Sequence, residues 1–225
     1  MKRIGLFGGT FNPIHRGHLQ VIQEVQEAFE LEQILLIPAA LPPHKEPRGV
    51  ADAKDRMQMI KLAVSDDPAL KQTVTVSDVE LKRSGPSYTI DTVRYFWQKM
   101  PQETELYFIL GLDAFLEIDT WKSYRNLFLL IPFIVMTRAK AGHDDNSMLP
   151  ALGDYLQSRI SNSYRFSTAQ SCYLDDEKQP VFMFKVTPID ISSTKIREFV
   201  KKGSGIEFMV PKKVEDFIKT KGLYL

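Results

Sequence analysis

Short, almost continuously apolar runs alternate with helical patterns along most of this 225-residue chain. Apolar residues at three- and four-residue spacing predict helices between the runs. Strands that are apolar on both faces and alternate with helices favour a parallel sheet covered on both sides. We therefore expect an α/β protein with a doubly wound parallel sheet and ligands at the carboxyl ends of the strands. The expected strands are Lys2–Phe7, Gln33–Pro38, Thr73–Val79, Glu105–Leu110, Ile131–Met136 and Val181–Val186. The helical patterns cover Leu19–Phe29, Met57–Val64, Ile90–Met100 and Trp121–Leu129.

The alternation weakens between residues 139 and 180, where a helix near Leu149–Ile160 is the one expected element before the last strand. Two helices are expected in the C-terminal part, residues 191–225. The length suits one domain over residues 1–225, with 139–180 as a segment that the pattern does not place.

Composition excludes several classes of protein. With 29 basic and 28 acidic residues the net charge is +1, so no global field favours nucleic acid or an anionic membrane. The single cysteine, Cys172, excludes an intramolecular disulfide and is expected to be a buried, inert thiol. The most apolar stretch, Leu127–Met136, contains Pro132 and is too short to cross a bilayer. We expect a cytoplasmic protein without nucleic-acid or membrane partners; assembly into a homodimer or larger homo-oligomer is left open.

The segment GGTFNPIHRGH (Gly8 to His18) joins the first strand to the first helix. Gly8 and Gly9 allow the backbone to approach a ligand closely. His15 and His18 stand one helical turn apart, so both imidazoles can point the same way as the unpaired N–H groups of the helix start. Together with the positive end of the helix dipole, they predict an anion site.

The same segment disfavours two common nucleotide-binding classes. Its glycines do not follow G-x-G-x-x-G, and the lysine of a P-loop is missing, which argues against a dehydrogenase and a P-loop kinase. Two structural alternatives stay open: a zinc pair, or a helix-capping His15 with His18 in the core. No further cysteine or carboxylate lies at ligand spacing to support the zinc pair.

Two loops follow other expected strands. In LPPHKEPRG, Pro42 and Pro43 restrict the backbone just before Lys45, which is either a solvated charge or a held cation. In GPSYTIDT, Ser87 or Thr89 can accept hydrogen bonds from first-turn amides of the next helix. Capping alone would explain these hydroxyls.

Three residues follow the strands farther along the chain. Asp113, in GLDAF, could accept hydrogen bonds from ribose hydroxyls or cap a helix. Trp121 could lie in the core or stack on an aromatic base. The guanidinium of Arg138 could bind phosphate or form a surface salt bridge.

The segment ISSTKIR (Ile191 to Arg197) opens a predicted helix. Its hydroxyl residues, Ser192, Ser193 and Thr194, are explained by capping. Lys195 and Arg197 are not, because cations near a helix N-terminus oppose the dipole unless an anion is bound.

These segments, in order from Gly8 to Arg197, resemble the GGTFxPxHxGH, PPHK, SYTxxT, GxD and ISSTxIR motifs of the bacterial nicotinate-nucleotide adenylyltransferases. That family belongs to the HxGH nucleotidylyltransferase superfamily. The resemblance implies a Rossmann-like nucleotidylyltransferase fold with C-terminal helices. It also implies adenylyl transfer from ATP to nicotinate mononucleotide, a step of NAD biosynthesis, by in-line attack without a covalent enzyme intermediate.

The resemblance further implies roles for individual residues. Catalytic roles fall to His15, His18, Lys45 and Arg197. ATP would be bound by Gly8, Gly9, Thr10, Phe11, His18, Ser192, Ser193, Thr194 and Arg197. Nicotinate mononucleotide would be bound by Lys45, Ser87, Tyr88, Thr89, Asp113, Trp121 and Arg138, with main-chain amides of Lys122, Ser123 and Tyr124 on its carboxylate. Mg²⁺ is implied as the cofactor, held mainly by the ATP phosphates, with no metal ligand from the protein.

One position departs from the family pattern: Asn12 stands where aspartate is frequent, which keeps a turn-forming hydrogen bond and removes a charge. We expect little functional effect. The nearest rival is the same fold with another acceptor, nicotinamide mononucleotide or pantetheine phosphate. A non-catalytic nucleotide-binding regulator and a zinc-binding module are the rivals from other classes.

Overall fold

The computed structural model describes residues 1–41, 49–138 and 148–225, and the chain divides into two compact units. The first unit comprises Met1–Phe7 and Tyr88–Pro188, and the second comprises Gly8–Ser87 and Ile189–Leu225. Each unit is therefore assembled from two separate stretches of chain.

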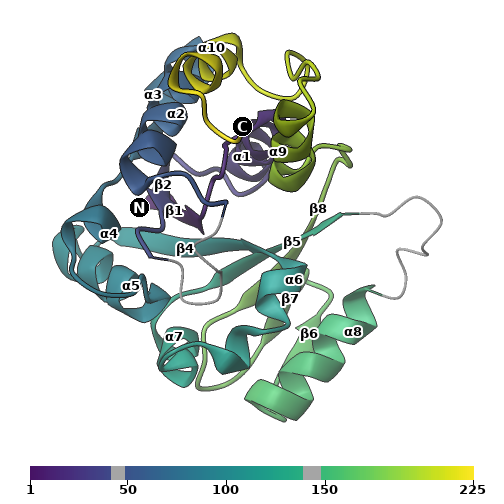
Figure 1. Ribbon diagram of the computed structural model, residues 1–225. Coiled ribbons are helices and arrows are strands. Elements are labelled where there is room, and N and C mark those ends of the chain that lie inside the picture. The colour runs from purple at the N-terminus through teal and green to yellow at the C-terminus, as the bar shows by residue number, and fades with distance from the viewer. Residues whose placement is uncertain (42–48, 139–147) are drawn as a thin grey trace. The chain divides into compact units, whose positions relative to one another are not determined.

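The first unit is built on a mixed sheet (Figure 1). β1, β4, β5 and β8 run parallel, and β7 and β6 continue the sheet in antiparallel pairing. The side chains of Phe133, Ile134 and Val135 in β5 are all 0% exposed, as expected for a strand covered on both faces. In pairing order the strands are β1 (Lys2–Gly9), β4 (Thr104–Gly111), β5 (Phe133–Arg138), β8 (Val181–Val186), β7 (Cys172–Leu174) and β6 (Arg165–Ser167).

Helices connect these parallel strands. An aromatic cluster of Phe115, Phe128 and Phe133 packs between helices and sheet, with ring centroids 4.8 to 6.0 Å apart. The helices are α5 (Thr89–Lys99), α6 (Leu112–Phe115), the 3-10 helix η1 (Ile118–Thr120), α7 (Tyr124–Leu130), α8 (Met148–Tyr155) and the π-helical turn η3 (Leu156–Ile160).

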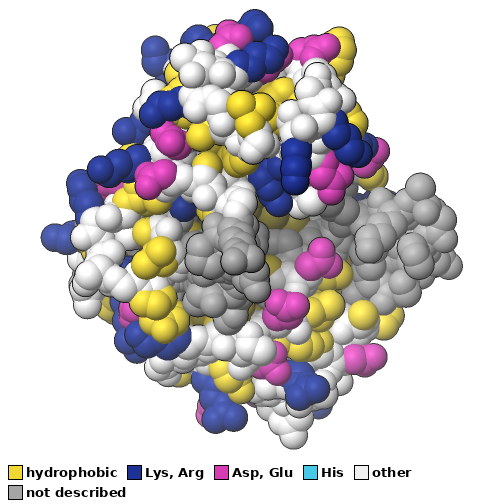
Figure 2. Space-filling model, in the orientation of Figure 1, with side chains coloured by type: hydrophobic (Ala, Val, Ile, Leu, Met, Phe, Trp, Pro, Cys, Tyr) yellow, Lys and Arg dark blue, Asp and Glu magenta, His cyan; other side chains and the backbone are white. Residues whose placement is uncertain are grey.

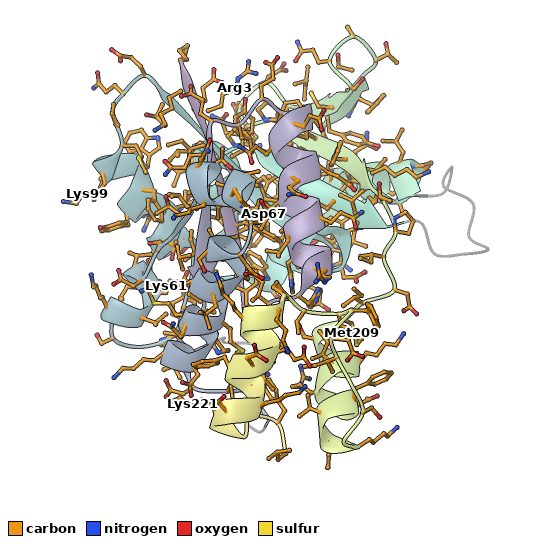
Figure 3. The ribbon with its side chains drawn as sticks, turned by 90° about the horizontal axis from the view of Figure 1, so that it is seen from above. Arg3, Lys61, Asp67, Lys99, Met209 and Lys221 are labelled. Atoms are coloured by element: carbon orange, nitrogen blue, oxygen red, sulfur yellow. The ribbon has the colours of Figure 1, made fainter. Side chains whose placement is uncertain are left out.

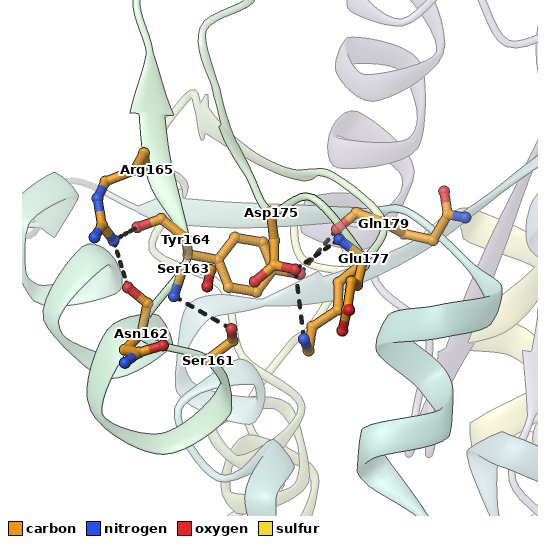
Figure 4. Close-up of polar contacts among 9 residues, drawn as sticks. Ser161, Asn162, Ser163, Tyr164, Arg165, Asp175, Glu177 and Gln179 are labelled. Carbon is orange, nitrogen blue, oxygen red and sulfur yellow. Dashed lines mark hydrogen bonds and ion pairs between the residues drawn. The ribbon is translucent and has the colours of Figure 1, made fainter.

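The segment that the sequence pattern does not place contains the expected helix and an unexpected hairpin. α8 and η3 together match the helix predicted near Leu149–Ile160. β6 and β7 were not predicted, because three residues are too short to show a strand pattern. Tyr164, which is 0% exposed, joins this segment to the chain before β8 by donating its hydroxyl to the carbonyl of Gln179 at 2.9 Å (Figure 4). Cys172 is buried, as expected.

The second unit contains the parallel strands β2 (Gln33–Pro38) and β3 (Val74–Val76). α10 lies beside α2 (Figure 3), and an ion pair of 3.3 Å joins Lys221 Nζ to Asp55 Oδ1. Basic and acidic side chains are intermixed over α2, α9 and α10 (Figure 2), in line with the small net charge. The helices are α1 (Arg16–Ala28), α2 (Ala53–Ser65), α3 (Pro68–Thr73), α4 (Val79–Lys82), α9 (Ser193–Lys201) and α10 (Lys212–Lys221).

The predicted doubly wound α/β fold is confirmed, with two local corrections: the antiparallel strands β7 and β6 extend the parallel part of the sheet, and one expected strand is shorter than predicted. The strand expected over Thr73–Val79 is limited to Val74–Val76, flanked by α3 and α4. Asp67 caps α3 by accepting from the Ala69 amide at 2.9 Å. This capping residue was missed in the prediction from sequence, because the Thr–Val alternation that follows is typical of a strand. Within the described part of the chain, no helix has both the length and the apolar character that crossing a membrane requires.

Candidate active site

The last residue of β1, Gly9, shows why glycine is needed where the strand enters the loop. A Cβ on Gly9 would lie 2.9 Å from a ring carbon of Phe11, closer than real Cβ contacts. Phe11 is 3% exposed and adopts the left-handed region (φ 47°), which turns the chain toward α1. Gly8 and Thr10, also predicted ATP contacts, are half-buried beside them.

The two predicted catalytic histidines lie together at the start of α1. His15 is the N-cap and His18 is the third residue of the helix, and their ring centroids are 3.7 Å apart. The backbone N–H of His15 donates to Nδ1 of His18 at 3.3 Å. A neutral His18 that accepts at Nδ1 carries its proton on Nε2, which is then a donor. The rings of Phe11 and His18 form a T-shaped pair, with centroids 5.2 Å apart.

The ISSTKIR segment forms the N-terminus of α9, as predicted, and contacts the same loop. Ser192 is the N-cap and accepts from the Lys195 amide at 3.2 Å. Ser193 donates its hydroxyl to the carbonyl of Pro13 at 2.9 Å. Arg197 donates to the carbonyl of Asn12 at 2.9 Å.

The two cations of this segment have protein partners. Lys195 pairs with Asp190 at 2.7 Å, and Arg197 also donates to the Thr194 hydroxyl at 3.3 Å. A guanidinium carries five N–H donors, so these bonds leave Arg197 further donors for an anion. The starts of α1 and α9 thus both lie on the Asn12–Pro13 loop within the second unit.

Asn12 is the centre of a hydrogen-bond network. Its Oδ1 accepts from the Ala51 amide at 3.0 Å and from the Tyr224 hydroxyl at 2.8 Å. Its Nδ2 donates to the carbonyl of Gly49 at 2.8 Å. An aspartate could not make this donation, so the amide at this position has a structural use that sequence reasoning did not find.

Arg56 is the main residue that sequence reasoning missed. Its side chain is 1% exposed, and its guanidinium donates to four backbone carbonyls: Thr10 at 2.6 Å, Ala39 at 2.6 Å, Ala51 at 2.9 Å and Ala40 at 3.3 Å. Burial lowers the pKa of Arg56, and the nearby Tyr224 and Asp52 oppose that shift. Arg56 therefore fixes the loop after β1 against the loop after β2.

A sequence signal for Arg56 existed. Arg56, Met59, Ile60 and Ala63 share the buried face of α2 at the i, i+3, i+4, i+7 spacing. A basic residue at an apolar-face position must find acceptors when buried, and here these are the carbonyls of the two loops.

Ser87 corrects one part of the sequence interpretation. The N-cap of α5 is Tyr88, and its side chain makes no capping bond. The Ser87 hydroxyl instead accepts from the amide of Ala40 at 2.9 Å, so it holds the loop after β2. Lys45, predicted in that loop, lies outside the described residues.

The first unit carries a pocket of about 460 Å³ beside the predicted base-stacking tryptophan. Trp121 is half-buried and forms a T-shaped pair with Phe108, with ring centroids 6.3 Å apart. Ser123 is in the left-handed region, at φ 54°. The lining residues are Asp119, Trp121, Ser123, Tyr124, Arg125 and Asn126.

The amide of Tyr124 is not available in the way the sequence suggested. It donates to the carbonyl of Trp121 at 3.2 Å, which leaves Lys122 and Ser123 as the candidate carboxylate donors. The ammonium of Lys122 lies 4.3 Å from the centre of the Tyr88 ring and pairs with Asp91 at 3.3 Å.

The remaining predicted residues of the first unit lie at the ends of its elements. Thr89 is half-buried and begins α5. Asp113 is exposed in the first turn of α6, just after β4. Arg138 is the last residue of β5, and its side chain is outside the described part. Within the described ranges, no group of three or more His, Cys, Asp or Glu residues could hold a metal ion.

Comparison with known proteins gives a consistent result. Residues 6–199 match the model of the family described as cytidylyltransferase-like. A protein of Desulfatibacillum aliphaticivorans named "Probable nicotinate-nucleotide adenylyltransferase" is 41% identical over 99% of this chain and 100% of its own length. Proteins with the same name from Trichlorobacter lovleyi and Geotalea uraniireducens are 39% and 37% identical over 99% of this chain and over 99% and 98% of their own lengths.

The chain is also similar to solved structures. The nicotinic acid mononucleotide adenylyltransferase of Plasmodium falciparum, complexed with NaAD, aligns with a TM-score of 0.73 at 19% identity. The alignment covers 100% of this chain and 98% of that chain. At this identity the likeness concerns the fold.

Proposed function

The chain belongs to the nicotinate-nucleotide adenylyltransferases, within the cytidylyltransferase-like family, and from this premise we propose how its residues carry out the reaction. The substrates are ATP and nicotinate mononucleotide, and the products are nicotinate adenine dinucleotide and pyrophosphate. An oxygen of the acceptor's 5′-phosphate forms a bond to the α-phosphorus of ATP. The bond from that phosphorus to the bridging oxygen breaks, and pyrophosphate leaves with the electron pair.

This chemistry needs no protein nucleophile and no strong base. The attacking phosphate is already ionised at neutral pH, so the protein contributes positioning and stabilisation of charge on the phosphoryl oxygens. Donors and helix N-termini are the groups suited to that task.

His18 supplies such a donor. Because its Nδ1 accepts the His15 N–H, a neutral His18 carries its proton on Nε2, and we propose that this N–H donates to a phosphoryl oxygen. His15 sits at the N-cap, where it lies against His18 at the positive end of α1. The pair therefore stabilises the transferred phosphoryl group by donation.

The start of α9 and Arg197 provide the second part of the polyphosphate site. The α9 amides point their donors outward at the helix start, and Arg197 carries a guanidinium at the Asn12 carbonyl. A planar guanidinium is suited to the leaving pyrophosphate. Lys45 is proposed to add a second cation to the leaving group.

The first unit supplies the acceptor side. The Trp121 pocket is lined by an indole and by the turn at Ser123, which suits an aromatic ring with a carboxylate. The amides of Lys122 and Ser123 are the proposed donors to that carboxylate. Tyr88, Thr89, Asp113 and Arg138 are proposed to contact the ribose and phosphate.

Mg²⁺ is proposed to arrive with ATP. We propose that the ATP phosphates hold most of the ion's coordination, because Mg²⁺ prefers oxygen ligands and is commonly bound through substrate phosphates. When bound there, the ion neutralises phosphate charge. The cytoplasmic location stays a prediction.

The observation that carries the proposal is the meeting of two helix N-termini on one loop. Ser193 and Arg197 of α9 bond to the carbonyls of Pro13 and Asn12, next to the histidine pair of α1. Two positive helix ends, two imidazoles and a guanidinium on a single loop are suited to binding a polyphosphate.

Steady-state pyrophosphate release with ATP and each acceptor tests the proposal. We expect the highest kcat/KM with nicotinate mononucleotide, compared with nicotinamide mononucleotide and pantetheine phosphate. His18→Ala should lower kcat by roughly 100- to 1,000-fold, the effect of losing one donor in comparable sites, with ATP affinity nearly unchanged. Preference for the amide acceptor, or normal turnover by His18→Ala, would overturn the proposal. Absence of pyrophosphate release with every acceptor tested would favour a non-catalytic nucleotide-binding regulator.

A further inference from the structure

Tyr155 links the segment without an assigned motif to the 3-10 helix η1. It is the last residue of α8, and its hydroxyl donates to Oδ1 of Asp119 at 2.8 Å. The same hydroxyl accepts from the backbone N–H of Asp119 at 3.2 Å. One phenol therefore holds both the side chain and the backbone of a single residue.

Asp119 is part of the Trp121 pocket. It lines the cavity together with Trp121, and the Trp121 amide donates to the carbonyl of Ile118 at 3.0 Å. The conformation of η1 (Ile118–Thr120) therefore sets the position of the Trp121 backbone, which caps its C-terminal end. If the hydrogen bonds of Asp119 to Tyr155 are lost, Asp119 can move, and the backbone of the next two residues transmits that movement to the indole of Trp121.

The surroundings keep the Tyr155 hydroxyl neutral. Its ring packs edge-on against buried Phe115, with centroids 6.0 Å apart. The pKa of Tyr155 is raised to about 12, mainly by burial; the hydrogen bond from the Asp119 amide opposes this shift, and the hydrogen bond to the Asp119 carboxylate adds to it. The hydroxyl therefore keeps its proton, and its donation to Asp119, at neutral pH.

We propose that Tyr155 is a positioning residue for the acceptor pocket, through which α8 fixes η1 and Trp121 for binding of the pyridine ring. This inference rests on the proposed function and gives residues 148–155 a role in it. Tyr155 touches no reacting atom, and its effect is on the binding of the acceptor. The effect on ATP should be small, because the ATP-binding residues proposed above belong to the second unit.

Tyr155→Phe removes one oxygen and both of its bonds. We expect the KM for nicotinate mononucleotide to rise about 5- to 20-fold, the effect of one to two net hydrogen bonds, with the KM for ATP within twofold of wild type. The kcat at saturating acceptor should stay within about threefold of the wild-type value, because the substitution loosens the pocket without removing any residue that lines it.

Tyr164→Phe is the matched control. Tyr164 also lies in the segment without a motif, is fully buried, and donates its hydroxyl to a carbonyl, that of Gln179 at 2.9 Å (Figure 4). It is not among the residues that line the Trp121 pocket. This variant should lose thermal stability and keep the wild-type KM for the acceptor. Equal increases in acceptor KM for both variants would overturn the proposal, because the effect would then be one of general stability.

Hydrogen exchange gives a readout that does not depend on the substrate. The amides of Asp119 and Trp121 should exchange about tenfold faster in Tyr155→Phe and at the wild-type rate in Tyr164→Phe. Unchanged exchange at Asp119 would overturn the positioning role. If wild-type protein forms no product from nicotinate mononucleotide, the proposed function fails, while the exchange result still decides whether Tyr155 holds η1.

Discussion

Loss of Arg56 should destabilise the second unit, because its guanidinium bonds to carbonyls of two loops. We consider Arg56→Met, which keeps a flexible side chain of similar length and removes the guanidinium. Three of its bonds, to Thr10, Ala39 and Ala51, are 2.9 Å or shorter. After the change, these carbonyls face an apolar side chain in a site where the native residue is 1% exposed.

The expected cost follows from these contacts. Each buried carbonyl left without a donor costs about 1–3 kcal/mol, so three of them set an upper bound of about 9 kcal/mol. Removing a buried charge returns part of this, because desolvation of the guanidinium no longer opposes folding. We expect a net loss of about 3–5 kcal/mol in unfolding free energy, or a fall of about 6–20 °C in Tm for a chain of this size.

The assay is urea unfolding followed by circular dichroism, with Lys61→Met as the control. Lys61 is exposed on the same helix, α2, and is labelled in Figure 3. Its substitution should change the unfolding free energy by about 0.5 kcal/mol or less. A loss below about 1 kcal/mol for Arg56→Met would refute the assignment of Arg56 as the residue that joins the two loops.

Three further predictions concern the same structure. Gly9→Ala should cost about 1–3 kcal/mol of unfolding free energy, because its Cβ would lie 2.9 Å from the buried Phe11 ring. Gly111→Ala, with nothing within 4 Å of the added carbon, should be close to wild type, and equal losses would refute the steric reason. Tyr224→Phe should lose about 1–2 kcal/mol of unfolding free energy through the bond to Asn12 Oδ1, with Tyr95→Phe, at a residue that is 42% exposed, as the control; equal urea midpoints for the two variants would contradict this prediction. The pKa of Tyr155 is raised from 10.0 to about 12, so its neutral form stabilises the fold below pH 10 and that contribution disappears as the pH rises toward 12. Between pH 10 and 12, the unfolding free energy from urea titrations should therefore fall less in Tyr155→Phe than in the wild type. An equal fall in both proteins would argue against the raised pKa of Tyr155.

The fold was predictable where the chain is buried on both faces. β2 after Gln33 and the first four residues of β5 are apolar at every position, and helical spacing separates them from the next strands. Thr73–Val79 misled because Thr–Val alternation is typical of a strand, while Asp67 and the proline after it start a helix instead. A three-residue strand such as β6 is too short to show the alternation of apolar and polar residues that predicts a strand.

The motifs of the candidate site were predictable from the sequence, but the buried residues that hold its loops in place were not. The histidine pair and the start of α9 were expected at helix N-termini, and the structure places them there. Arg56 and Tyr224 were missed because a charged or phenolic side chain in an amphipathic or terminal segment is usually solvated. Their partners are loop carbonyls and an amide far away in the sequence, which no local pattern encodes.

The division of each unit into separated stretches has a consequence for synthesis on the ribosome. Gly8–Ser87 emerges early, yet Ser193, Arg197 and Tyr224, which bond to its Asn12–Pro13 loop, follow after all of Tyr88–Pro188 has been made. At about 5–20 residues per second, those ~100 residues take roughly 5–20 s. Throughout that interval the loop that holds the histidines lacks the α9 side of its polar network. The nascent chain therefore acquires a complete phosphate-binding loop only late in translation, and a chaperone that shields Gly8–Ser87 has several seconds in which to act.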